Sequence, residues 1–325
     1  MSHLNQIAAR TPRFIVLIPL TLAFLIGWIS QRMGLCLVAA ITMLLYRRPT
    51  LFVALITCGL FGLLLTPLFH LLNVSQPYYQ PVTPLYLLII GGLLFGISSV
   101  LNDGCSVGTL TKLARGDISK IMTIIGWVIG IVLWRTLSQF PAEKMAQMPS
   151  PTATNYLLAF ALVVASLSIL IRYQREKHFV GLSILLGLLT SSLFTFEPQW
   201  APSLLFYDIA HGIWSQGTWP ISMLRIGVFG VMLLGMFSFT LYRKTFDYQA
   251  LNPGRGGQYL LAGIIMGASA SMMIGGNDSQ ILLVFPTLTL TTTLPLASVC
   301  IGIVLALQVK KGFNRRRNLR DKAAA

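Results

Sequence analysis

Two cysteines beside glycine breaks are the residues with the clearest capacity for chemistry in this sequence. Cys105 follows a polar break that ends at Gly104, and Cys36 follows a break that ends at Gly34. A thiol is a weak hydrogen-bond donor with a polarizable sulfur, which suits a soft ligand. Cys105 would also begin a short helix over residues 106–113, where free backbone N–H groups and the helix dipole favour an anion.

The composition places these cysteines in a membrane protein. Of the 325 residues, 55% are hydrophobic and 10% are charged, with a mean hydropathy of +0.74, whereas globular domains carry about 25% charged residues. The net charge of +15 comes mainly from basic clusters between apolar runs, which is the positive-inside pattern and not a nucleic-acid surface. We therefore expect a lipid bilayer around the chain, no nucleic-acid partner, and both termini in the cytoplasm.

The apolar runs predict an all-α polytopic membrane protein with about nine transmembrane helices and about four short half-depth helices. The spanning helices are expected over residues 14–29, 51–72, 85–101, 118–137, 156–171, 179–196, 221–242, 259–274 and 294–309. The short helices are expected over residues 35–46, 106–113, 203–214 and 280–286. Residues 310–325 are expected to form a loosely ordered, basic cytoplasmic tail, and residues 1–325 a single membrane domain.

The sequence also predicts an internal repeat. Two glycine-rich segments align, each followed by a break and a short helix, and a later Ile-Gly-Ile-Val-Leu segment at 129–133 recurs at 301–305. The paired positions in the first alignment are Gly92 with Gly263, Gly96 with Gly267, Ser98 with Ser269, and Gly104 with Gly275. Because the basic loops give the two copies opposite directions, we expect an inverted-topology repeat, with halves at about 14–171 and 179–309, as in many transporters.

Three motifs resemble those of the YeeE/YedE family of bacterial inner-membrane proteins. They are Arg32-Met-Gly-Leu-Cys36, Gly104-Cys-Ser-Val-Gly108-Thr-Leu, and Gly275-Gly-Asn-Asp278 followed by Ile-Leu-Leu after two further residues. The resemblance covers nearly the whole chain. It implies an inverted-repeat fold in the bacterial inner membrane and uptake of thiosulfate past cysteines near the middle of the membrane.

The resemblance also assigns cysteine positions. Its first two cysteines fall on Cys36 and Cys105, and its third falls at about Gly276, where this chain has no cysteine. We expect Gly276→Cys to be tolerated. Cys58 and Cys300 lie inside ordinary apolar runs and are expected to serve packing alone.

The candidate substrate-binding residues follow from these motifs. They are Cys36, Cys105, Gly104, Ser106, Gly108, Thr109, Gly275, Gly276 and Asn277. Secondary candidates are Arg32 and Lys112, as contacts for an anion, and Asp278. Each has a structural alternative: a thiol can be a small buried hydrophobe, Asp278 can cap a helix, and Lys112 can be a positive-inside anchor.

The most direct function is inward transport of a small sulfur-containing anion, thiosulfate or a similar ion, with a cytoplasmic sulfur-carrier protein as a candidate partner. The alternative is a membrane scaffold that binds such a carrier and transports nothing. The four cysteines lack metal-ligand or disulfide spacing, and no Ser-His-Asp order or Walker loop occurs. We therefore expect no enzymatic activity, no metal and no cofactor.

Overall fold

The computed structural model describes residues 13–71, 79–81, 83–138, 145–147, 152–172, 178–214 and 221–323. Its long helices are α2 (Arg13–Met33), α4 (Thr50–Leu71), α5 (Leu85–Leu101), α7 (Lys120–Leu137), α8 (Ala153–Arg172), α9 (His178–Phe196), α11 (Met223–Tyr242), α12 (Pro253–Met273) and α14 (Leu290–Ala323). Its short helices are α3 (Leu37–Leu45), α6 (Ser106–Ala114), α10 (Pro202–Trp214) and α13 (Asn277–Ser279). A π-helical turn, η2 (Gln280–Val284), and a 3-10 turn, η3 (Phe285–Thr287), follow α13.

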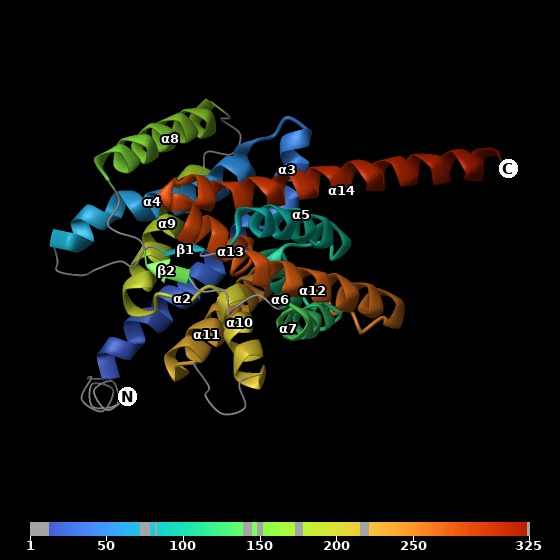
Figure 1. Cartoon of the computed structure of the whole chain (residues 1–325), viewed down its shortest axis with the longest axis horizontal. Coiled ribbons are helices and arrows are strands. Elements are labelled where there is room, and N and C mark those ends of the chain that lie inside the picture. The colour runs from blue at the N-terminus through green and yellow to red at the C-terminus, as the bar shows by residue number, and fades with distance from the viewer. Residues whose placement is uncertain are drawn as a thin grey trace.

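The described residues contain nine apolar helical segments long enough to cross a membrane. Three of these segments combine a long helix with the short helix or turns that follow it, over Val16–Leu45, Leu85–Ala114 and Pro253–Thr287. The chain is therefore an all-α polytopic membrane protein, as predicted, and its helices pack side by side in one bundle (Figure 1).

Three local features differ from the prediction. A short antiparallel pair, β1 (Tyr79–Pro81) with β2 (Met145–Gln147), joins two segments expected to be loops. Helix α12 begins six residues earlier than expected, because Asn252 accepts a hydrogen bond from the N–H of Arg255 and proline suits the first turn. Helix α14 continues to Ala323, so the basic tail is helical up to that residue, consistent with its many lysine, arginine and alanine residues.

The two predicted helix breaks are present and have the same backbone geometry. Asp103 and Ile274 adopt the left-handed conformation, with φ of 55° and 58°. The next residue in each case is glycine, whose N–H closes the helix on the carbonyl five residues earlier: Gly104 on Ser99 at 2.9 Å and Gly275 on Ala270 at 2.8 Å. Such a left-handed residue with a closing hydrogen bond is a common way to end a helix.

Glycines bring helices of the two predicted halves into backbone contact. A methyl group added at any of these positions would overlap a carbonyl oxygen of the crossing helix, so only glycine fits. Between α5 and α14, the added carbon would lie 2.7 Å from the Pro295 oxygen when placed at Gly92 and 2.3 Å from the Val299 oxygen when placed at Gly96. Between α12 and α7, it would lie 2.3 Å from the Thr123 oxygen when placed at Gly263 and 2.0 Å from the Trp127 oxygen when placed at Gly267. The second pair of contacts repeats the first at the aligned positions.

The direction of the helices supports an inverted arrangement. The contacts above make α14 parallel to α5, and α7 parallel to α12. Helices α5 and α12 are antiparallel, because Gly91 near the start of α5 lies against Met272, while the Leu101 carbonyl at the end of α5 accepts a hydrogen bond from Gln258 at 2.6 Å. The α5–α7 unit is therefore inverted relative to the α12–α14 unit.

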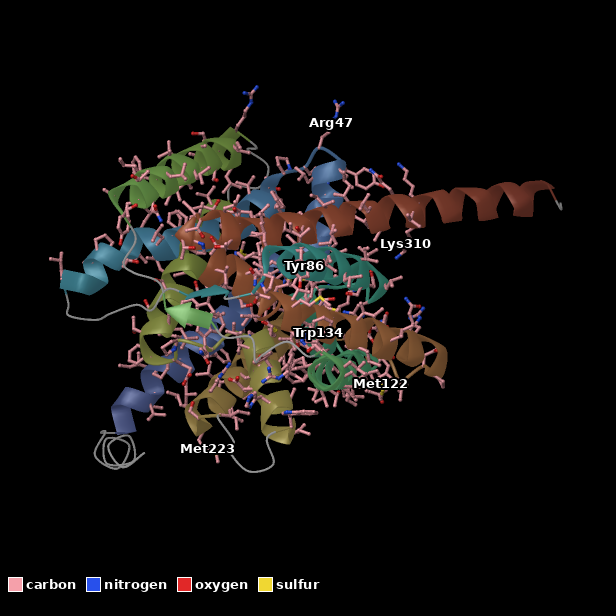
Figure 2. The ribbon with its side chains drawn as sticks, viewed as in Figure 1. Arg47, Tyr86, Met122, Trp134, Met223 and Lys310 are labelled. Carbon is pink, nitrogen blue, oxygen red and sulfur yellow. The ribbon has the colours of Figure 1, made fainter. Side chains whose placement is uncertain are left out.

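The two ends of the described chain lie at opposite ends of the bundle (Figure 1). Helix α2 is parallel to α11, since Leu20 of α2 lies against Gly227 near the start of α11, and Gln31 near the end of α2 donates a hydrogen bond to Thr240 near the end of α11, so α2 begins where α11 begins. Figure 2 shows Met223, at the start of α11, far from Lys310 on α14. Because α2 and α3 fall within one candidate span and the described residues hold nine, we expect the two ends of the described chain on opposite sides of the membrane. The side that each terminus faces stays a prediction.

The glycine crossings predict which substitutions destabilise the bundle. Gly96→Ala and Gly267→Ala should each cost about 1–3 kcal/mol, because the added methyl group forces two backbones apart. Gly230→Ala is the matched control, since a methyl group there would meet no atom within 4 Å. Thermal unfolding in detergent measures the effect, and equal midpoints for all three variants would show that the close approach is unimportant.

The odd number of crossings predicts a topology. A reporter active only in the periplasm should give signal when fused ahead of α2 and none when fused after Arg317, since the basic helix ends near Arg243 and Lys310 favour the cytoplasm. Absence of signal from both fusions, each confirmed to be expressed, would contradict the single crossing.

Candidate functional site

Four short helices begin close together in the middle of the bundle. Helix α3 starts after Cys36 and α6 after Cys105, while α13 starts after Gly276 and α10 starts at Pro202. Cys36, Cys105 and Gly276 each have an extended backbone that leads into the helix. The first N–H groups of a helix have no partner within it, so this arrangement gathers hydrogen-bond donors in one place.

Side chains of α13 meet the starts of α6 and α10. The N–H of Ser106 donates to Oδ1 of Asn277 at 3.2 Å, and the N–H of Ser203 donates to Oδ2 of Asp278 at 3.0 Å. The Ser106 hydroxyl lies 2.7 Å from the same Asn277 oxygen and 2.9 Å from Oδ1 of Asp278. The buried Asp278 carboxylate, 3% exposed, is thus stabilised by N–H and hydroxyl donors.

The Ser106–Asn277 contact joins equivalent positions of the repeat. These two residues are 171 positions apart, as are Gly104 and Gly275, which end the two broken helices. A contact between equivalent residues places them where the two inverted units meet. Ser106 and Asn277 therefore mark the centre of the internal symmetry.

The thiols of Cys36 and Cys105 lie against each other at the starts of α3 and α6. They share a hydrogen bond, and the Cys105 sulfur accepts a second one from the N–H of Leu37 at 3.2 Å. A methyl group at Gly108 would lie 2.6 Å from the Cys36 sulfur. Gly108 therefore leaves the space that brings the two thiols together.

The side chain of Asn102 holds the first helix break in place through hydrogen bonds, a role that was not predicted from the sequence. Its Nδ2 donates to the carbonyl of Gly104 at 2.7 Å and to the hydroxyl of Thr109 at 2.8 Å. Its Oδ1 accepts from the hydroxyl of Thr123 at 2.6 Å. Gly104 and Thr109, both predicted to bind substrate, lie in this supporting network. The sequence offered one signal for this role, an amide side chain directly before the break.

Lys120 was also missed as a structural residue. Its side chain is fully buried, donates to the Asn102 carbonyl at the end of α5, and lies 3.4 Å above the centre of the Tyr259 ring. A cation at a helix C-terminus and over an aromatic ring is favourable. In the sequence Lys120 looked like one more positive-inside charge, because nothing there shows that it turns inward.

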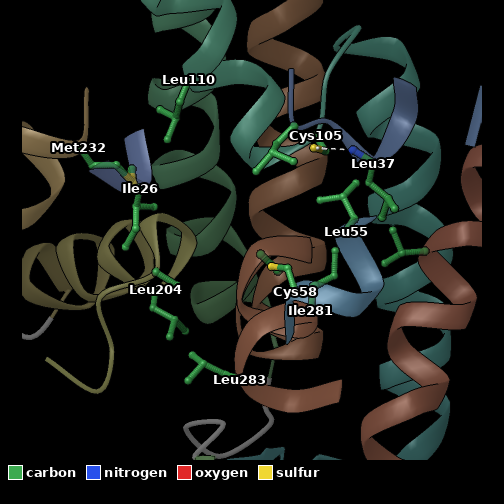
Figure 3. Packing of buried hydrophobic residues seen from close by; sticks show 14 of the residues in the cluster. Ile26, Leu37, Leu55, Cys58, Cys105, Leu110, Leu204, Met232, Ile281 and Leu283 are labelled. Carbon is green, nitrogen blue, oxygen red and sulfur yellow. Dashed lines mark hydrogen bonds between the residues drawn. The ribbon is translucent and has the colours of Figure 1, made fainter. Parts of the chain in front are cut away.

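A cavity of about 50 Å³ lies beside the helix starts. Four predicted residues line it: Cys36, Cys105, Asn277 and Asp278. The rest of the lining is mainly apolar and consists of Ile26, Ser30, Leu35, Leu37, Leu55, Cys58, Val107, Leu186, Thr190, Trp200, Pro202, Met232, Met236, Ile281 and Leu282. Figure 3 shows Cys58 and Cys105 among these buried residues with Leu55, Ile26 and Met232.

Gly276 is more crowded than the sequence suggested. A methyl group there would lie 2.8 Å from Oδ1 of Asp278, 3.0 Å from Cβ of Ser203 and 3.1 Å from the Trp127 ring. The expectation that Gly276→Cys is tolerated therefore conflicts with the packing, because the new side chain would displace the Asp278 carboxylate. Gly275, at a φ of 103°, holds a conformation that other residues rarely adopt.

The two predicted basic contacts do not line this cavity. Lys112 forms an ion pair with Asp103 at the outside of the break. Arg32 lines a separate open pocket of about 620 Å³, together with Trp28, Gln31, Arg115, Phe239, Tyr242, Arg243 and Thr245. The neighbouring residues Ser30 and Gln31 of α2 line the cavity and the pocket respectively.

The thiol contact predicts the effect of a single methyl group. Gly108→Ala should push the Cys36 sulfur away from Cys105 and weaken ligand binding, whereas Gly181→Ala should have no effect because a methyl group there meets no atom within 4 Å. Formation of a Cys36–Cys105 disulfide by a mild oxidant, followed by mass spectrometry, measures thiol proximity. Equally rapid disulfide formation in the Gly108→Ala and Gly181→Ala proteins would contradict this role for Gly108.

Comparison with known proteins agrees with this geometry. The pattern of the sulphur transport family matches residues 32–222, a region that begins at Arg32 and includes both Cys36 and Cys105. No curated protein matches the chain. Because the match covers more than half of the sequence and the fold has the predicted spans and breaks, the chain belongs to the sulphur transport family, the YeeE/YedE family that its motifs indicate.

Proposed function

We propose that the protein carries thiosulfate, or a closely similar sulfur-containing anion, across the bacterial inner membrane into the cytoplasm. The observation that carries this proposal is the meeting of two thiols and four helix starts at one buried cavity. Membership of a sulphur transport family supports the same class of substrate.

The cavity has the size of a small ion. A water molecule needs roughly 10–15 Å³ on this measure, so 50 Å³ holds about three or four waters or one small oxyanion. Among the described residues that line the cavity there is no lysine or arginine. An anion would therefore be held by dipoles and weak donors, which bind it without the cost of burying a permanent cation.

The thiols are placed to act as those donors. Backbone N–H groups of Val38 and Ala39 contact the Cys36 sulfur, and that of Gly108 contacts the Cys105 sulfur. N–H groups that point at a sulfur draw electron density from it and strengthen its S–H as a donor. Each thiol would donate to an anion oxygen while its polarizable sulfur contacts the soft sulfur of the ligand.

The arginine pocket supports inward movement. Arg32, Arg115 and Arg243 line it at the end of the bundle where α11 and α6 finish. Positive charge at the mouth of a path raises the local concentration of anions. We assign this mouth to the cytoplasm from its basic residues, and a cytoplasmic sulfur-carrier protein that receives the ligand would approach from this side.

Substitution of Cys105 tests the proposal. Cys105→Ser should lose at least about 90% of thiosulfate uptake, because serine removes the polarizable sulfur and alters the contact with Leu37. Cys300→Ser is the matched control, since Cys300 lies on α14 outside the cavity lining. Uptake is measured as labelled thiosulfate entry and as growth on thiosulfate as sole sulfur source, with membrane expression checked for each variant.

Two outcomes would count against the proposal. Full uptake by a well-expressed Cys105→Ser protein would remove the cysteine site. Failure of the unaltered protein to support uptake would favour the alternative of a scaffold that binds a sulfur carrier.

A further inference from the structure

The cavity is lined by more sulfur atoms than the two predicted cysteines supply. Cys58, Met232 and Met236 also line it. Cys58 comes from α4, and the two methionines come from α11. Five sulfur-bearing side chains therefore surround a space of about 50 Å³.

We propose that Cys58 is a third ligand-contacting thiol, and that Cys58 and Met232 form a soft wall which selects an anion with an exposed sulfur over an all-oxygen oxyanion. This inference rests on the proposed function and goes beyond it, because it names the residues that set selectivity. It also revises the expectation that Cys58 serves packing alone.

The Cys58 thiol lies at the cavity and is available for a contact with the ligand. Its side chain is 2% exposed and faces the cavity. Cys36 and Cys105 are hydrogen-bonded to each other and to backbone N–H groups. Among the described residues, no hydrogen bond to the Cys58 thiol is found. A bound ligand would provide the partner that this buried thiol lacks.

The backbone of Cys58 is fixed by a close helix crossing. A methyl group at Gly187 of α9 would lie 2.8 Å from the Cys58 carbonyl oxygen. On the other side of the bundle, a methyl group at Gly27 of α2 would lie 2.0 Å from the Met232 carbonyl oxygen. The α4–α9 crossing and the α11–α2 crossing are thus alike. In each, a glycine packs against the carbonyl oxygen of a residue that lines the cavity, Cys58 in the first and Met232 in the second.

The Cys58 thiol replaces the ligand-contacting thiol that this chain lacks at Gly276. That position is closed by Asp278, Ser203 and Trp127, so the second broken helix has no room for a thiol. Cys58 supplies one from a neighbouring helix instead. The number of cysteines at the cavity is therefore three, although only two belong to the broken-helix motifs.

The chemistry of the wall favours a soft ligand. An oxyanion such as sulfate presents only oxygens, and each one that is buried without a good donor carries a desolvation cost. Thioether and thiol sulfurs are weak hydrogen-bonding groups but polarizable ones. The sulfur of a thiosulfate-like anion can rest on this wall while its oxygens face the helix starts, and sulfate has no atom suited to that place.

The test compares Cys58→Ser and Cys58→Ala with Cys300→Ser, another cysteine in an apolar helix. Both Cys58 variants should raise the KM for thiosulfate about three- to tenfold, the effect of losing one sulfur contact. They should also increase inhibition of uptake by excess sulfate. Cys300→Ser should leave both quantities unchanged. If Cys58→Ser and Cys58→Ala keep the unaltered KM and sulfate sensitivity while Cys105→Ser loses uptake, this inference falls and the proposed function stands.

A labelling measurement on the unaltered protein is independent of transport and of variant folding. In membrane vesicles, a small thiol-specific reagent is applied with and without thiosulfate or sulfate, and modification of Cys58 and Cys300 is measured by mass spectrometry. Thiosulfate should slow labelling of Cys58 and leave Cys300 unchanged, and sulfate should protect neither. Labelling of Cys58 at the same rate with and without thiosulfate would overturn the inference.

Discussion

The hydrogen bond between Ser106 and Asn277 is the contact on which the centre of this protein depends. It joins equivalent residues of two inverted units, so the starts of the two short helices that follow the breaks lie against each other. Without it the Ser106 N–H at the start of α6 would be buried without a partner, at a cost of about 1–3 kcal/mol. The same contact places Cys105 and Asp278 on one cavity.

The described residues that line the site include no lysine or arginine, so charge is handled there by other groups. The Asp278 carboxylate accepts from the Ser203 N–H and lies beside the Ser106 hydroxyl, while the buried Lys120 is kept apart, at the end of α5 under Tyr259. Asp278 and Lys120 are therefore stabilised by hydrogen-bond donors, a backbone carbonyl and an aromatic ring close to them. The cavity is left with thiols and apolar surface, which suit a weakly hydrated, polarizable ligand.

Hydropathy and glycine spacing predicted the helices, the breaks and the pairing of Gly104 with Gly275, because bilayer thickness and the left-handed helix end leave strong local signals. The side of the membrane on which the first helix begins stays a prediction, since the basic residues near Arg13 resemble a cytoplasmic anchor while an odd number of candidate spans favours the other side. The roles of Asn102, Lys120 and Cys58 depend on which way a side chain points at a distant helix, and neither hydropathy nor motif spacing contains that information. The crowding around Gly276 likewise comes from three separate helices.

The glycine crossings have a consequence for how the protein could move. Each crossing joins a helix of one predicted half to a helix of the other: α2 to α11, α4 to α9, α5 to α14 and α7 to α12. The halves are interlocked, so rocking one against the other would break all four backbone contacts at once. Movement that preserves these contacts has to occur between crossed pairs. The natural rigid body is therefore a crossed pair of helices with one member from each predicted half.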